Sequence, residues 1–186
     1  IAAKFVDQQC GSAMAGIHIG FMEIAQDFAD IVLVGGMEHL TRVPMGGSLI
    51  DRGAIVPNMS LFLDSQYQHW DMMTTTNMGL TAEKLFAQTD FTKEDMDKWG
   101  LRSHQRAAAA QAEGFFDGEI LPIEAEQADG SMMVVDKDQA IRGDSTLEGI
   151  ASLKPAFKKD GVITAGISSP LNAGATSMML MSKDTA

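Results

Sequence analysis

The apolar pattern near the start of the chain predicts a strand, a helix and a second strand. Residues 1–9 contain Phe5-Val6 and are interpreted as the end of a strand. From Gly11 to Gln26, apolar residues recur at three- and four-residue steps, which predicts a helix packed on a sheet. They are Met14, Ile17, Phe21, Ile24 and Ala25. Residues Asp30 to Glu38 hold an apolar run closed by a glycine pair, typical of a strand buried on both faces. Such a unit favours the α/β fold class with a parallel sheet.

The middle of the chain predicts helices, one of which has capping signals at both ends. Residues 41–76 show no clear period and predict loops and short helices. A helix is expected over Met78–Gln88. A longer one should begin after Thr92-Lys-Glu-Asp95, which resembles a capping box with Asp in the place of Glu or Gln. That helix should run to about Glu113, where Gly114 can end it.

The last third returns to short strands. Residues 120–123 and 132–135 are expected to flank an Asp129-Gly130 turn, and residues 179–181 to end a further apolar strand. The chain therefore predicts a helical and β-containing insertion between two pieces of α/β sheet, with junctions near Gly46 and Val162.

Charge and composition narrow the class of protein. A net charge of −11 argues against nucleic-acid binding. The sequence has neither a run of about 18 apolar residues nor the pattern of a signal peptide, so we expect no membrane span and a location in the cytoplasm or an organelle matrix. Basic residues gather at Arg142, Lys154, Lys158 and Lys159. These residues form either a site for an anionic ligand or a solvated turn.

Cys10 is the only cysteine, so an internal disulfide is excluded. It falls at the expected start of a helix, where unpaired backbone N–H groups favour the reactive thiolate form of a cysteine. The small residues Gly11, Ser12 and Ala13 would let a substrate approach the sulfur and a backbone N–H face an oxyanion. The same features also describe a tight turn with an inert, packed cysteine.

Several motifs along nearly the whole chain share one order and spacing. They are Cys10-Gly-Ser-Ala-Met, Val34-Gly-Gly-Met-Glu-His39, Asn77-Met-Gly-Leu-Thr-Ala-Glu83, Arg102-Ser-His-Gln105, Leu153-Lys-Pro-Ala-Phe157 and Thr164-Ala-Gly-Ile-Ser-Ser169. In this order they resemble the thiolase family, and more closely the degradative 3-ketoacyl-CoA thiolases than the biosynthetic acetoacetyl-CoA enzymes. The resemblance implies a layered α/β/α core with an inserted loop domain. Residues 1–45 would be the second half of the N-terminal core, 46–161 the CoA-binding loop domain and 162–186 the return to the core.

The resemblance also implies an activity. Cys10 would take the acyl group of a 3-ketoacyl-CoA as a thioester and pass it to CoA, or work in the condensing direction. The family's other catalytic groups come from an Asn-Glu-Ala-Phe segment, a Gly-His-Pro histidine and a Cys-x-Gly-Gly cysteine, none of which occurs in this sequence. We therefore expect those groups to lie outside this chain. The four histidines, His18, His39, His69 and His104, are interpreted as structural or surface residues.

Five positions match residues that contact CoA in thiolases. Arg142 matches an arginine near the nucleotide end and Phe157 an aromatic residue beside the adenine. Ala165 and Ser169 match small residues along the pantetheine arm, and Met78 a residue beside the acyl tunnel. Other positions depart from the biosynthetic pattern, which leaves the acyl-chain length open; they are Asn77, Gly149, Ile167 and Pro170.

The resemblance implies CoA thioesters as substrates, no tightly bound cofactor, no metal and no nucleic-acid partner. It further implies a homo-oligomer, with membership of a fatty-acid oxidation complex as one option. Two other readings stay open at this point. The chain could be a catalytically incomplete module that only binds CoA or a protein partner, or a cysteine-dependent acyl hydrolase, which would need a nearby base.

Overall fold

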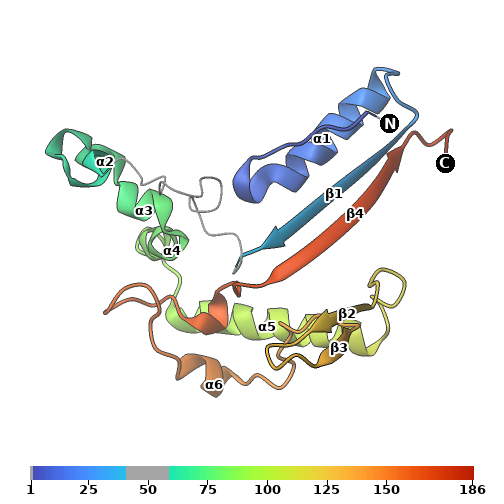
Figure 1. The fold of residues 1–186 in the computed structure, drawn as a ribbon. Coiled ribbons are helices and arrows are strands. Elements are labelled where there is room, and N and C mark those ends of the chain that lie inside the picture. The colour runs from blue at the N-terminus through green and yellow to red at the C-terminus, as the bar shows by residue number, and fades with distance from the viewer. Residues whose placement is uncertain (1, 41–58) are drawn as a thin grey trace. The chain divides into compact units, whose positions relative to one another are not determined.

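The computed structural model describes residues 2–40 and 59–186 (Figure 1). The chain divides into two compact units, one formed by residues 1–56 and 171–186 and the other by residues 57–170. The predicted junction near Gly46 lies outside the described residues. The division into 1–45, 46–161 and 162–186 stays a prediction, because compactness does not show which part binds CoA.

The first unit is a two-stranded sheet packed against one helix. A short 3₁₀ turn, η1 (Gln9–Gly11), leads into α1 (Ser12–Ala25), and β1 (Ile31–His39) pairs antiparallel with β4 (Ala173–Met181). Helix α1 lies along both strands (Figure 1). The helix and both of these strands were predicted.

Two expectations for this unit are wrong. Residues 2–8 pair with no described strand, so the expected strand at 1–9 is not formed there. The expected parallel pairing is not seen among the described residues: β1 pairs antiparallel with β4, a segment more than a hundred residues later in the chain. The sequence pattern of β1 identifies a strand but not its neighbour.

Small residues, rather than the predicted apolar stripe, bring α1 onto the sheet. A Cβ added at Gly20 would lie 3.0 Å from Leu180 Cδ1 and 3.1 Å from Val32 Cγ1, so the backbones approach closely. In contrast, Met14 is 57% exposed and Phe21 is 67% exposed. The expected stripe is therefore only partly turned toward the sheet.

The opposite face of the sheet is apolar and open in this unit. Leu33 and Met179 are register partners on this face, exposed by 70% and 59%, and Met37 is 85% exposed. The expectation that β1 is buried on both faces is thus not met among the described residues.

The second unit is mainly helical and carries one β-hairpin. Its helices are α2 (Ser60–Leu63), η2 (Ser65–Trp70), α3 (Met72–Thr76), α4 (Met78–Phe86), α5 (Lys93–Ala112), α6 (Leu147–Ala151) and η3 (Ala165–Ile167). The hairpin pairs β2 (Ile123–Glu126) with β3 (Met132–Val135). Its first strand begins three residues later than predicted, after Pro122, which has no N–H to donate to a strand partner.

The ends of α5 follow the predicted chemistry, and α4 begins at a cap that the sequence analysis did not identify. The side chain of Asn77 accepts a hydrogen bond from the N–H of Leu80, and Thr92 and Asp95 form a complete capping box. Gly114 adopts φ +72°, the left-handed conformation expected after a helix end. The signals at Thr92 and Gly114 explain why α5 was predicted nearly to the residue.

The interior of the second unit lies around η3. Among the described residues of this unit, the buried ones are Gly79, Glu83, Asp97, Ile150, Ile163 and Thr164. Within residues 2–40 and 59–186, no helix is both long enough and apolar enough to cross a membrane. The same residues contain no group of three or more His, Cys, Asp or Glu placed to hold a metal ion.

Candidate functional site

Cys10 lies on a sharp turn directly before α1. Its predecessor Gln9 has φ 52°, a left-handed conformation that non-glycine residues rarely adopt. Hydrogen bonds hold the turn: Gly11 N–H donates to Gln8 O at 3.0 Å, Gln8 N–H to Ser12 Oγ at 2.8 Å, and Ser12 Oγ to Gln9 O at 2.7 Å. Strained backbone of this kind is maintained only where surrounding bonds over-determine it, and it often occurs at functional sites.

The thiol of Cys10 is accessible and close to the start of a helix of 14 residues. Gly11, the N-cap of α1, provides no side-chain acceptor for the first-turn N–H groups of the helix. Such a helix end attracts negative charge. The turn therefore presents an exposed cysteine directly before the N-terminus of a helix.

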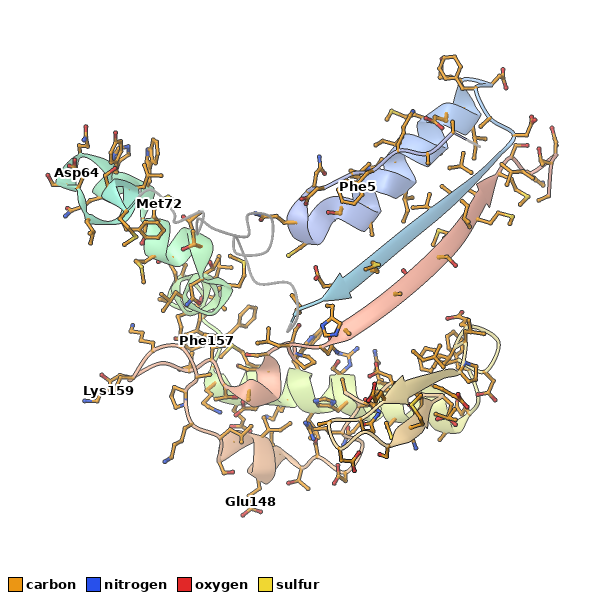
Figure 2. All side chains as sticks on the ribbon, in the orientation of Figure 1. Phe5, Asp64, Met72, Glu148, Phe157 and Lys159 are labelled. Atoms are coloured by element: carbon orange, nitrogen blue, oxygen red, sulfur yellow. The ribbon has the colours of Figure 1, made fainter. Side chains whose placement is uncertain are left out.

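The five predicted CoA contacts lie in the second unit, whereas Cys10 lies in the first. Met78 is the first residue of α4 and is 64% exposed. The ring of Phe157 packs on the next residue, Gly79, where an added Cβ would overlap the ring. Figure 2 shows Phe157 beside α4. It also shows Lys159, which follows two residues later, at the outer tip of the loop that contains both residues. Met78 and Phe157 are thus brought together at the start of α4.

Ala165 and Ser169 are exposed on a turn that two helices hold in place. Ala165 begins η3, and Ser169 follows its end. A Cβ at Gly100 of α5 would lie 2.8 Å from Gly166 O, and a Cβ at Gly166 would lie 2.9 Å from Ile150 Cγ2 of α6. Such close approach on both sides fixes the backbone from which Ala165 and Ser169 project.

Arg142 is held through its backbone rather than its side chain. Its N–H donates to His104 Nδ1 at 3.2 Å. His104 is half-buried on α5, which differs from the expectation of a surface histidine. The side chain of Arg142 is exposed, as are those of Lys154, Lys158 and Lys159.

Glu83 is a part of this region that the sequence reasoning missed. It is buried on α4, and its Oε1 accepts the N–H groups of Val162 and Ile163, both at 2.9 Å, while Oε2 accepts Val162 N–H at 3.1 Å. The only signal was its place at the end of the Asn77–Glu83 motif. Its partners lie about eighty residues later, beyond the reach of a local pattern.

A hollow of about 680 Å³ lies within the second unit beside η3. Apolar side chains of α4 and α5 form much of its wall, including Leu85, Phe86 and Trp99, and Ser168 and Ser169 lie at its edge. Ser169 lines this hollow, but Met78, Arg142, Phe157 and Ala165 do not. The hollow and the Met78–Phe157 surface are therefore different features of the unit.

An ion pair joins α3 to α4 near these positions. Lys84 Nζ lies 2.7 Å from Asp71 Oδ2, and this hydrogen bond holds the pKa of Asp71 below its usual value of 3.8. Asp71 itself has φ 45° and is the residue at which η2 ends and α3 begins. The pair thus ties a strained connection to the helix that carries Met78 and Glu83.

Curated proteins similar to this chain carry the names of thiolases and acetyl-CoA acyltransferases. The chain is 38% identical over 187 residues to the 3-ketoacyl-CoA thiolase of Chromohalobacter salexigens, covering 100% of this chain and 45% of that protein. It is 37% identical over 187 residues to a probable acetyl-CoA acyltransferase of Staphylococcus aureus, covering 100% of this chain and 48% of that protein. The chain therefore spans about half the length of these relatives.

The fold of this chain also matches solved structures of an acetyl-CoA acetyltransferase and a 3-ketoacyl-CoA thiolase. An acetyl-CoA acetyltransferase from Syntrophomonas wolfei superposes with a TM-score of 0.75 at 33% identity, covering 98% of this chain and 46% of that one. Human mitochondrial 3-ketoacyl-CoA thiolase gives a TM-score of 0.70 at 33% identity, covering 94% and 44%. The model of the thiolase N-terminal domain matches residues 1–184. With an accessible cysteine before α1 and the thiolase motifs in order, the chain belongs to the thiolase family, as part of its N-terminal domain.

Proposed function

We propose that this protein is an acyltransferase that cleaves or forms 3-ketoacyl-CoA, with the acyl group carried as a thioester on Cys10. The observation that carries the proposal is the accessible thiol on a strained turn at the N-terminus of α1. The names of the relatives, 3-ketoacyl-CoA thiolase and probable acetyl-CoA acyltransferase, support the same reaction class.

In the cleaving direction the Cys10 thiolate attacks the 3-keto carbonyl carbon and forms a tetrahedral oxyanion. The bond between C2 and C3 then breaks, and its electron pair stays on C2, which takes a proton to give acetyl-CoA. A CoA thiol next attacks the shortened acyl thioester, and the Cys10 thiolate is released. N–H groups at the start of α1 would stabilise negative charge near the sulfur.

The second unit would hold the CoA substrate. We propose that residues 46–161 form the CoA-binding loop domain, between core segments 1–45 and 162–186. Met78, Arg142, Phe157, Ala165 and Ser169 would contact the CoA. Support comes from the exposed positions of these side chains on a backbone that α4, α5 and α6 fix by close contacts.

The same proposal extends to the protein's substrates, its location and its assembly. CoA and acyl-CoA are substrates rather than resident cofactors, and the protein acts in fatty-acid β-oxidation as a cytoplasmic homo-oligomer. The open apolar face of the β1–β4 sheet supports assembly, because large exposed apolar patches usually mark contact surfaces.

Two measurements on one preparation test this function. Iodoacetamide labelling is followed on the peptide that contains Cys10, the single cysteine of this chain. We expect rapid labelling that acyl-CoA slows, and, once the family's other catalytic groups are also present, thiolysis of a 3-ketoacyl-CoA that Cys10→Ala abolishes. Protection without thiolysis would favour a module that only binds CoA. Release of free fatty acid without transfer to CoA would favour a hydrolase. Slow labelling that acyl-CoA leaves unchanged would overturn the proposal.

A further inference from the structure

One buried carboxylate has no role in the chemistry proposed above. Glu83 is 9% exposed and accepts three hydrogen bonds from two consecutive backbone N–H groups, those of Val162 and Ile163. Among the residues that the structure describes, it forms no ion pair. A buried carboxylate without a cation is costly unless hydrogen bonds satisfy it. An apolar residue at the same position would usually stabilise the fold equally well.

The segment bound by Glu83 belongs to a closed loop. Ala156 N–H donates to Ile163 O at 2.9 Å, Pro155 and Thr164 form an antiparallel bridge, and Gly161 N–H donates to Lys158 O at 3.0 Å. A Cβ at Gly161 would overlap the Glu83 carboxylate, so this glycine is what lets the loop approach it. Residues 155–164 therefore form one closed unit attached to α4.

This loop connects the two groups of proposed CoA contacts. Phe157 lies within it and packs on Gly79, one helical turn before Glu83 on α4. Ala165 follows directly after Thr164, which is fully buried. Two attachments on the same helix thus fix the loop, the ring of Phe157 at one point and the carboxylate of Glu83 at the other.

We propose that Glu83 is a positioning residue of the CoA site. By binding the N–H groups of Val162 and Ile163, its carboxylate fixes Phe157 and Ala165 relative to each other and so sets the affinity for CoA. A carboxylate suits this role because hydrogen bonds to a charged acceptor are stronger and more exacting in geometry than those to a neutral one. The inference rests on the proposed function, since it concerns the same CoA site.

Glu83→Gln tests the inference, with Glu94→Gln as matched control on the exposed face of α5. The probe is CoA itself, and the readout is the CoA concentration that half-protects Cys10 from iodoacetamide. We expect Glu83→Gln to raise this half-protecting CoA concentration about tenfold, equivalent to about 1.4 kcal/mol of binding free energy. Glu94→Gln should leave it unchanged. Because Cys10 lies in the other unit, its labelling rate without CoA should be the same in all three proteins.

Hydrogen exchange separates positioning from a purely structural role. The amides of Val162 and Ile163 should exchange faster in Glu83→Gln than in the unchanged protein. Faster exchange with unaltered CoA protection would overturn the inference. Absence of CoA protection in the unchanged protein would instead overturn the proposed function.

A second variant keeps the test decisive if Glu83→Gln fails to fold. Gly161→Ala adds a Cβ that would displace the loop from the Glu83 carboxylate while the carboxylate itself is kept. It should also raise the half-protecting CoA concentration, by a similar factor. A folded Gly161→Ala protein with unaltered CoA protection would contradict the inference.

Discussion

Gly79 is the position where one added methyl group should do the most local damage. It lies in the first turn of α4, and a Cβ at this position would overlap the ring of Phe157. The overlap involves the ring carbons nearest the backbone, so a small side-chain rotation does not relieve it. In Gly79→Ala the ring must leave its site on α4.

The size of the effect follows from the covered surface of that ring. Phe157 is 41% exposed, so about three fifths of it is covered. For an aromatic side chain of about 200 Å² this corresponds to about 120 Å². At about 25 cal/mol per Å², its loss costs about 3 kcal/mol. Alanine returns at most about 1 kcal/mol through its higher helix propensity. We expect Gly79→Ala to lower the free energy of unfolding by about 2 kcal/mol.

Urea unfolding followed by circular dichroism measures this loss, and Gly118→Ala is the control. A Cβ at Gly118 would meet nothing within 4 Å, so this variant should stay within about 0.5 kcal/mol of the parent. The double variant Gly79→Ala/Phe157→Ala should be no less stable than Phe157→Ala alone, because the overlap has been removed. Equal stability of Gly79→Ala and Gly118→Ala, or additive losses in the double variant, would refute the reasoning.

Two further predictions concern local polar bonds in the same unit. Thr92→Ala removes the capping box of α5 and should cost about 1 kcal/mol in urea unfolding, whereas no loss would show that the cap is not needed. The bond from Lys84 holds the pKa of Asp71 below 3.8, so the stability that this carboxylate contributes is present above pH 3.8 and lost as the pH falls through the lowered pKa. The stability difference between the unchanged protein and Asp71→Asn should therefore shrink with acidification, and a pH-independent difference would contradict this.

Sequence reasoning succeeded where the cause of a structure is local. Helix α5 carries its own start and stop signals at Thr92 and Gly114, and both were found where expected. The turn at Asp129-Gly130 likewise predicted the hairpin, and its first strand begins after Pro122, which cannot donate a hydrogen bond to a strand partner.

It failed where a structure depends on a distant neighbour. The apolar period of α1 pointed to Met14 and Phe21, but the helix approaches β1 through Gly16 and Gly20, which no hydrophobicity pattern marks. The antiparallel partner of β1 lies in a segment near the other end of the chain. Its strand character could be read from the sequence, but its pairing could not.

The candidate site also has one part that local sequence signals predict and one part that they do not. The place of Cys10 before a helix was predicted from its neighbours, and the structure adds the strained Gln9 conformation that shapes the turn. The attachment of Val162 and Ile163 to Glu83 was not foreseen, because the motif that contains Glu83 gives no sign of a partner eighty residues later. Burial of a carboxylate is visible only in the folded chain.

The central claim is that Cys10 carries the acyl group, and mass spectrometry of the protein after brief mixing with a 3-ketoacyl-CoA tests it most directly. We expect an added mass equal to the shortened acyl group, located on the peptide that contains Cys10 and removed by hydroxylamine or by CoA. An unmodified Cys10 peptide under conditions where the 3-ketoacyl-CoA is consumed would contradict the account.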